Sequence, residues 1–104
     1  MLTVTVVRIY ISEAEKRLKP IMHYLHDEIH LKGVTVFRGI SGFGISGKIH
    51  EASLMDLSLD LPLVIEFFDT HQHVTEILPH LISFAEPDHI ISWTAQLHHD
   101  VTQS

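Results

Sequence analysis

The chain has 104 residues, a formal net charge of −6 with histidine counted as neutral, and no cysteine. The length predicts one domain over residues 1–104. A hydrophobic content of 45% is high for the small core that such a chain can form, so we expect other copies of the chain to cover part of its surface. The negative charge argues against nucleic-acid binding, which needs a basic stripe, and the absence of cysteine excludes disulfides and thiolate chemistry.

The first segment, from Thr3 to Ile11, is rich in β-branched residues at both odd and even positions, which predicts a central strand. Arg8 interrupts one of its faces and needs a partner there. The N-terminal segment lacks a charged leader with a cleavage site, and no run approaches the roughly 20 apolar residues of a membrane span. We therefore expect a cytoplasmic protein without a membrane span.

A helix is predicted next, from about Lys19 to Leu31, because proline at position 20 suits a first helical turn. Its apolar residues recur at helical spacing: Leu18, Ile21, Met22, Leu25 and Ile29. Gly33 is the expected C-terminal stop. The segment Gly33–Phe37 predicts a second strand.

Alternating apolar residues from Leu57 to Phe67 predict a long third strand, bulged or broken near residues 60–62. Asp69-Thr70 then signals the start of a second helix, with Pro79 as a kink or an early end. Its expected apolar stripe is Val74, Ile77, Leu78, Leu81 and Ile82. The segment Ile91–Leu97 alternates as a last strand. The order β-α-β-β-α-β predicts the α+β class. It is typical of the ferredoxin-like fold, an antiparallel four-stranded sheet with two helices on one face.

Four of the five glycines lie in one stretch, RGISGFGISGKIH, between Arg38 and His50. Glycine permits positive φ and lets a ligand approach main-chain N–H groups closely, so this stretch between Arg38 and Lys48 is a candidate cradle for an anion. The spacing is neither a Walker A motif nor a Rossmann fingerprint. A hairpin or flexible loop without a ligand explains the glycines as well.

Catalytic signatures are absent from the sequence, so we do not expect an enzyme. Glu66 lies on the third strand, where it is expected either to pair with Arg8 or Arg38 across the sheet or to contact a ligand. The ten histidines support an alternative, a metal-binding protein or enzyme that uses the surface set His23, His26 and His30 at helical spacing.

Four segments together resemble one family of small bacterial proteins of unknown function, DUF190. They are VVRIYIS (Val6–Ser12), GVTVFRGISGFG (Gly33–Gly44), KIH (Lys48–His50) and DLPLVIEFFDT (Asp60–Thr70). That family is similar in fold to the nitrogen-regulatory PII signalling proteins. The resemblance covers about residues 6–97.

The resemblance implies a compact homotrimer whose sheets face a common centre, with adenine nucleotides bound in clefts between subunits. It also implies that the segment from Gly39 to His50 corresponds to the PII T-loop, which touches target proteins such as a transporter or an enzyme. Thr35 would then lie near the base, and Gly42–Gly44 near the phosphates or at the hinge of the loop. The full set of expected ligand contacts is Thr35, Arg38, Gly42, Phe43, Gly44, Lys48, His50 and Glu66.

The chain departs from the PII pattern before its last strand. PII proteins carry a glycine-rich phosphate loop with a lysine there, whereas this chain reads FAEPDHIIS and has no arginine after Arg38. The departure argues against tight binding of a triphosphate and favours a less charged nucleotide or another small anion. A structural trimer without any ligand is the remaining alternative.

Overall fold

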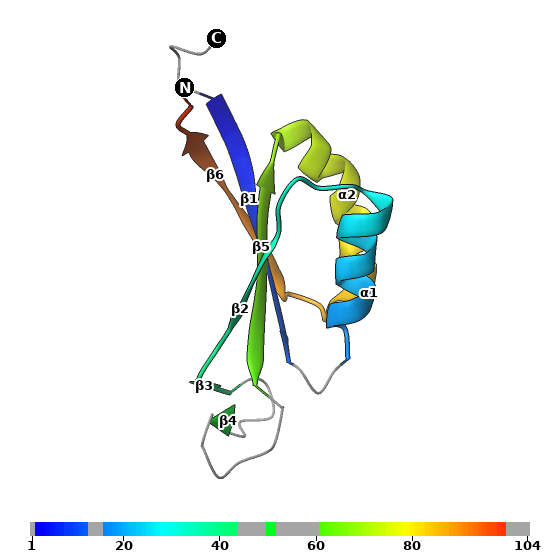
Figure 1. The fold of residues 1–104 in the computed structure, drawn as a ribbon, viewed down its shortest axis with the longest axis vertical. Helices are drawn as coiled ribbons and strands as arrows, with labels where there is room; N and C mark the ends of the chain where they lie inside the picture. Colours follow the sequence, from blue (N-terminus) through cyan, green and yellow to red (C-terminus); the bar gives the residue numbers. More distant parts are fainter. Residues whose placement is uncertain (1, 13–15, 44–49, 52–60, 100–104) are drawn as a thin grey trace.

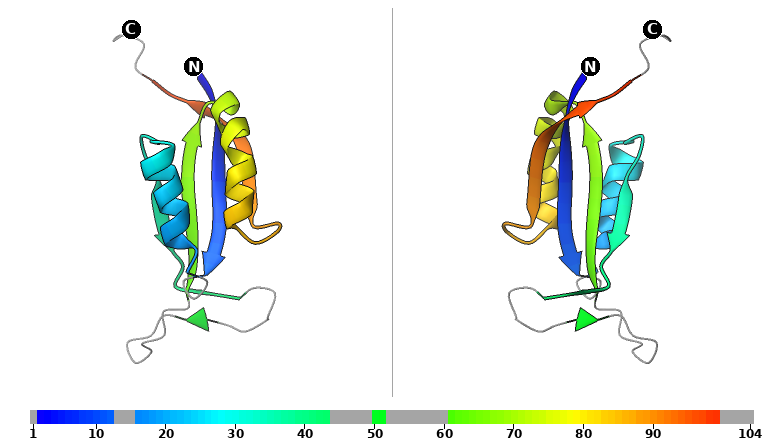
Figure 2. Two further views of the ribbon diagram at one scale, coloured as in Figure 1. Left: turned by 90° about the vertical axis from the view of Figure 1, so that its right-hand side faces the viewer. Right: turned by 90° about the vertical axis from the view of Figure 1, so that its left-hand side faces the viewer.

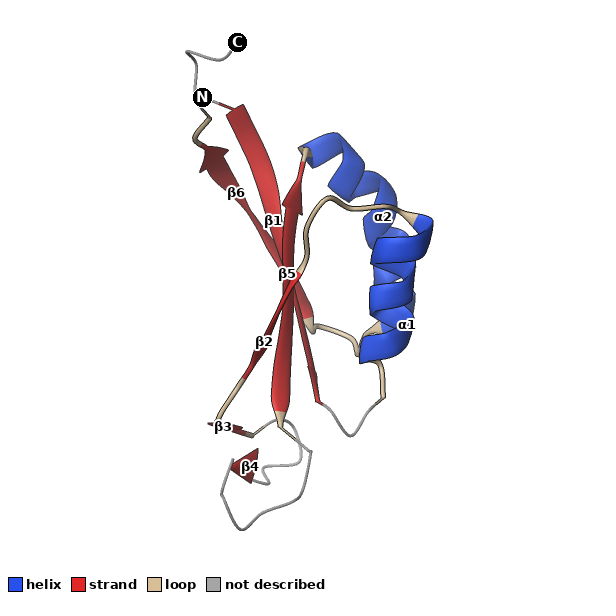
Figure 3. Ribbon diagram, viewed as in Figure 1, coloured by secondary structure: helices blue, strands red, loops and turns tan. Residues whose placement is uncertain are grey.

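The computed structural model describes residues 2–12, 16–43, 50–51 and 61–99. Figures 1 and 3 show the order of its strands and helices. They are β1 (Leu2–Ser12), α1 (Leu18–His23), the π-helical segment η2 (Tyr24–Glu28), β2 (Thr35–Arg38), β3 (Ser41–Gly42), β4 (His50–Glu51), β5 (Pro62–Asp69), α2 (His71–Phe84) and β6 (Ile90–Leu97). Within the described ranges, no helix is both long enough and apolar enough to cross a membrane.

The main sheet has four strands in the order β2-β5-β1-β6, and each neighbouring pair is antiparallel. Both helices cover one face of this sheet, as the side views in Figure 2 show. The short strands β3 and β4 pair with each other beyond the end of the sheet that lies away from the termini (Figure 1). The predicted α+β, ferredoxin-like arrangement is therefore confirmed, with β1 as a central strand.

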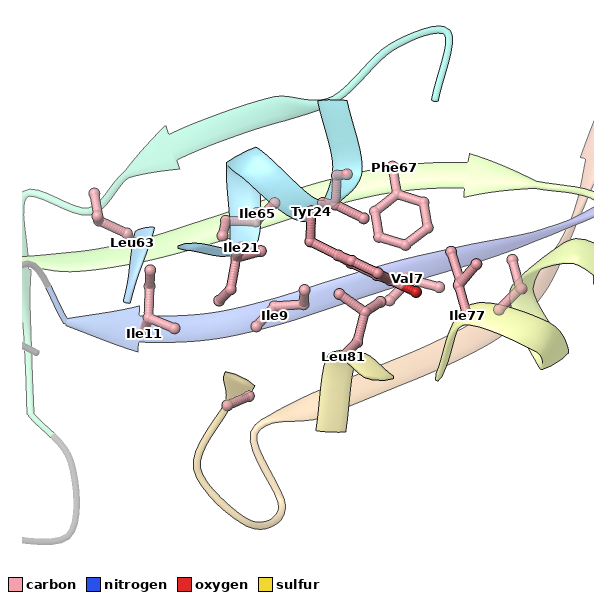
Figure 4. Packing of buried hydrophobic residues seen from close by; sticks show 13 residues of the cluster. Val7, Ile9, Ile11, Ile21, Tyr24, Leu63, Ile65, Phe67, Ile77 and Leu81 are labelled. Atoms are coloured by element: carbon pink, nitrogen blue, oxygen red, sulfur yellow. The ribbon is translucent and has the colours of Figure 1, made fainter. Parts of the chain in front are cut away.

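The hydrophobic core lies between the sheet and the helices (Figure 4). Alternate residues of the two central strands point toward the helices: Val7, Ile9 and Ile11 from β1, and Leu63, Ile65 and Phe67 from β5. The helices supply most of the apolar stripes that the sequence predicted, including Ile21, Leu25, Val74, Ile77 and Leu81. Ile82, predicted as part of the second stripe, is instead exposed on α2. Each such side chain contributes about 1.5–3 kcal/mol through removal from water, so this layer is the main source of stability.

The first helix ends earlier than predicted, at Glu28 instead of Leu31, and Gly33 does not stop it. The left-handed residue is His30, with φ 60°. Its conformation turns the chain so that the Leu31 N–H donates to the Leu25 carbonyl at 3.0 Å, which closes the last turn. Histidine is an unusual residue for this role, and the more permissive glycine three positions later misled the prediction.

Other boundaries shift by a few residues. The second strand, β2, begins at Thr35 instead of Gly33. Strand β5 begins at Pro62, and proline is tolerated as the first residue of a strand although it has no N–H to donate to the sheet. The predicted residues 57–60 of that strand lie outside the described residues. Thr70 caps α2 as predicted, since its side chain accepts from the His73 N–H at 3.2 Å.

Pro79 does not end α2 early, because the helix continues to Phe84. Pro79 and Thr75, whose carbonyl would normally accept from residue 79, both lie on the exposed side of the helix. Water can therefore hydrogen-bond the carbonyl that lacks an amide donor, and the helix tolerates the proline.

Candidate functional site

The second face of the main sheet is not covered by either helix (Figure 2). We call it the open face. Strand alternation and register place on it Val4, Val6, Arg8 and Tyr10 of β1, Val64, Glu66 and Phe68 of β5, Thr35 and Phe37 of β2, and Ile91, Trp93 and Ala95 of β6. Its large apolar side chains are exposed, with Phe68 at 54% and Trp93 at 41% of their full accessible area. Exposed apolar side chains gathered on one face in this way are typical of interaction surfaces.

One polar row crosses the centre of the open face. Thr35 lies opposite Glu66, and Glu66 lies opposite Arg8. The Arg8 Nε donates to Glu66 Oε1 at 2.6 Å, so the predicted pairing of Glu66 with an arginine across the sheet is confirmed for Arg8. The guanidinium carbon of Arg8 also lies 5.5 Å from the ring centroid of Trp93, within cation–π range.

Two hydrogen bonds act on the Arg8 side chain in the polar row. The bond to Glu66, and a second to the Tyr10 side chain, raise the pKa of the Arg8 guanidinium above its ordinary value. The carboxylate of Glu66 in turn accepts from a permanent cation, so this pair contributes no net charge to the open face. An acid–base role for Glu66 would require breaking this bond first.

The predicted ligand contacts do not all lie together. Thr35 and Glu66 are neighbours on the open face. Arg38 lies opposite Leu63, whose side chain faces the helices, so β2 directs Thr35 and Arg38 to opposite faces of the sheet. Gly42 pairs with His50 in the β3–β4 ribbon at one end of the sheet.

The start of the glycine-rich stretch packs closely on Pro62, the first residue of β5. A Cβ added at Gly39 would come within 2.6 Å of the Pro62 Cγ, and one added at Gly42 within 3.1 Å. The Gly39 N–H donates to the Pro62 carbonyl at 2.7 Å. Close packing therefore explains both glycines, and the Gly39 N–H is already bonded instead of being directed at a ligand.

Two large apolar side chains project from this region, and the sequence predicted a ligand contact at only one of them, Phe43. Phe43 is 73% exposed and Ile40 is 80% exposed. In the sequence, one apolar residue follows each of two glycines, Gly39 and Gly42, and this pattern could have indicated that both side chains are exposed. The other predicted contacts in this stretch, Gly44 and Lys48, lie outside the described residues.

We expect Gly39→Ala to destabilise the protein by about 1–3 kcal/mol, because the added methyl group would overlap the rigid proline ring and crowd the Pro62 carbonyl. Urea unfolding followed by circular dichroism measures the change. Gly33→Ala is the matched control, since no atom lies within 4 Å of the added methyl group there. Equal stability of the two variants would contradict close packing as the reason for Gly39.

The turn before β6 is held by Arg17, for which the sequence predicted no role. The Arg17 guanidinium donates to the Phe84 carbonyl at 2.9 Å and to Glu86 Oε1 at 3.0 Å. Asp88 adopts a left-handed φ of 63°, and the His89 N–H closes the turn on the Glu86 carbonyl at 3.2 Å. No local pattern announces the Arg17 contacts, since their partners follow at least 67 residues later. Because Glu86 and Asp88 are both acidic, this turn disfavours binding of an anion.

The histidines of the first helix face a carboxylate. The Nδ1 atoms of His23 and His26 each lie 2.6 Å from an oxygen of Asp27, and these hydrogen bonds, from His26 first, lower the pKa of Asp27. His30 lies beyond the helix in its left-handed turn. In the part of the chain that the structure describes, no three His, Cys, Asp or Glu side chains gather in a way that would hold a metal ion.

The comparisons with known sequences agree with the resemblance stated above. The profile of the DUF190 family, described as "Uncharacterized ACR, COG1993", matches residues 4–97. UPF0166 protein MJ1524 of Methanocaldococcus jannaschii is 34% identical over 86 residues, which cover 78% of each chain. A UPF0166 protein of Aquifex aeolicus is 37% identical over 76 residues, covering 69% of this chain and 72% of the relative.

Among solved structures, a similar one is entitled "Structure of CPII bound to ADP and bicarbonate, from Thiomonas intermedia K12". The two folds superpose with a TM-score of 0.59 over 90% of this chain and 85% of that one, at 23% sequence identity. At this identity the match concerns the fold, and it confirms the PII-like arrangement of strands and helices that the sequence predicted.

Proposed function

We propose that this chain, which belongs to the DUF190 (UPF0166) family and has a PII-like fold, is a non-enzymatic regulatory protein. In this proposal it forms a homotrimer, binds a small effector in the clefts between subunits, and presents the segment from Gly39 to His50 to a partner protein. The effector acts only through the difference between its affinities for two states of the protein.

The uncovered, apolar open face is the observation that carries the proposal. Five of its side chains, Tyr10, Phe37, Phe68, Ile91 and Trp93, are each at least 37% exposed. Burying such a face against other copies would supply the driving force for assembly. It would also account for a hydrophobic content of 45% in a chain with a charge of −6.

The effector of this proposal is an adenine nucleotide of low charge, such as ADP, or another small anion. Thr35, on the open face of the edge strand β2, is the described contact that would serve it. Arg38 lies on the other face of β2 and would serve only an effector that reaches around this edge of the sheet, with Lys48 as a further cation. The Glu86 carboxylate at the turn before β6, held by Arg17, disfavours a triphosphate at that position. The ligands named for the solved PII-like structure, ADP and bicarbonate, belong to the same chemical range.

Solution mass and a thermal-shift screen test the two parts of the proposal separately. We expect a three-chain mass, and a higher melting temperature with ADP, AMP, bicarbonate or phosphate, since a hundredfold excess over Kd adds about 2.7 kcal/mol of stability. Thr35→Val should reduce the shift, whereas Thr94→Val, on the helix-facing side of β6, should leave it unchanged.

Two results would overturn the proposal. A single-chain mass at working concentrations would remove the clefts. A three-chain mass without any ligand-induced shift would remove the effector and leave a structural trimer. The screen also includes ATP and a zinc salt. A larger rise in melting temperature with ATP than with ADP would contradict the proposed preference for an effector of low charge.

A further inference from the structure

The polar row is an unexpected feature of the open face. The apolar row Phe68–Val6–Trp93 lies on one side of it and the row Phe37–Val64–Tyr10 on the other, according to the strand register. Transferring the Arg8–Glu66 ion pair from water into an apolar interface costs free energy that its own attraction barely repays. An apolar pair of similar size would bind a flat partner at least as well, so affinity does not explain why charges lie here.

A second copy of this chain is the occupant that fits the open face. Four strands spaced about 4.8 Å apart and roughly eight residues long give a face of roughly 500 Å² per copy, so the three copies of the proposed assembly would bury roughly 1,500 Å² through their open faces. The face carries one cation and one anion, Arg8 and Glu66, whereas the whole chain carries a charge of −6. A self-complementary neutral patch therefore lets acidic chains meet without repulsion across the contact.

The Arg8–Glu66 contact leaves hydrogen-bonding capacity unused. It joins the guanidinium Nε to one carboxylate oxygen, while a guanidinium has five N–H donors and a carboxylate accepts about four hydrogen bonds. Trp93 lies against the guanidinium as a cation–π partner, and Tyr10 hydrogen-bonds to it. Both contacts hold Arg8 at the surface of the sheet, within reach of an acceptor on a facing copy.

We propose that Arg8 and Glu66 set the register in which copies of this chain associate through their open faces. This inference rests on the assembly in the proposed function, and it assigns Glu66 to the contact between copies instead of to the effector. When copies face each other, one relative placement brings the carboxylate of one copy to the guanidinium of the next. A shifted placement would put charges against Phe68 or Tyr10 and leave them desolvated and unpaired.

Complementary charge reversals test this register by mixing. Like charges facing each other oppose association, so we expect Arg8→Glu and Glu66→Arg each to raise the concentration for half-assembly about 100-fold. Three copies drawn from two variants keep one like-charged contact and gain two complementary ones. Mixing the variants in equal amounts should therefore restore assembly in part, by at least about tenfold, measured by analytical ultracentrifugation. Mixing cannot repair a contact within one chain, because each variant keeps its own like-charged pair, so rescue identifies a contact between copies.

Two further variants complete the experiment. The double variant Arg8→Glu/Glu66→Arg restores complementarity and should assemble as the natural chain does. The apolar variant Arg8→Met/Glu66→Leu should assemble as tightly but into a broader range of masses, because it lacks the register constraint. Glu66→Gln, which keeps the shape, replaces Glu66→Arg if circular dichroism shows that the latter fails to fold, and weaker assembly is expected again.

The outcomes separate this inference from the proposed function. Single-chain mass for the natural protein would overturn both. Three-chain mass for the natural protein together with unchanged assembly of both single variants would overturn the register alone. Impaired single variants that mixing does not rescue would also overturn it, since the pair would then act only within one chain.

Discussion

Ile65→Ala is expected to lower the free energy of unfolding by about 2–5 kcal/mol, a large part of the stability of a domain this small. Ile65 has no exposed area, and it lies at the centre of β5 between Ile9 of β1 and Val36 of β2. Removing its outer carbons leaves a cavity against strands that cannot move closer, because their hydrogen bonds fix their spacing.

Chemical denaturation measures this loss, and Ile82→Ala is its matched control. Ile82 has the same side chain but is 61% exposed on α2, so its truncation should change stability by no more than about 0.5 kcal/mol. Both midpoints are compared at one protein concentration, because assembly adds to apparent stability. A similar loss in the two variants would contradict the assignment of Ile65 to the core.

Phe68→Asp is expected to abolish the proposed three-copy assembly while the subunit stays folded. Phe68 is 54% exposed on the open face, so its loss removes little from the core. Placing a carboxylate there forces a charge without a partner into any contact that covers the open face, which opposes association strongly. The mass measured by light scattering should fall to that of one chain, 11.9 kDa.

Ile82→Asp serves as the control for this change, because it adds the same charge at a site of similar exposure on the helical side. It should leave the three-chain mass intact. Retention of that mass by Phe68→Asp would show that copies associate through some other surface. Far-ultraviolet circular dichroism confirms folding, since aspartate in a strand costs only about 1 kcal/mol.

The fold was predictable because the strands and helices of this chain carry strong periodic patterns. In β1, Val7, Ile9 and Ile11 face the core while β-branched residues also occupy the other face, and this combination indicated a central strand. In α2 the threonine cap and the stripe of Val74 and Leu81 indicated the start and the buried side of the helix. Such signals are local, so a single sequence reveals them.

The parts that could not be predicted depend on contacts between distant residues. From the sequence alone, Gly39 suggests a flexible loop. Its close packing against Pro62 of β5, 23 positions later, is seen only in the folded structure. The Arg17–Glu86 pair joins residues 69 apart, and neither residue stands out from its neighbours in sequence. The pairing of Glu66 with Arg8 was one of two predicted alternatives, and the register of β1 with β5 decided between them.

The central position of β1 has a consequence for the way this chain reaches its native state. Both neighbours of β1 come late in the sequence: β5 begins at Pro62 and β6 at Ile90. During synthesis, one edge of β1 therefore has no partner until β5 emerges from the ribosome, and the other edge has none until β6 emerges near the end of the described chain. Pairing between distant segments slows folding, and an unpaired strand edge is prone to aggregate until its partner arrives.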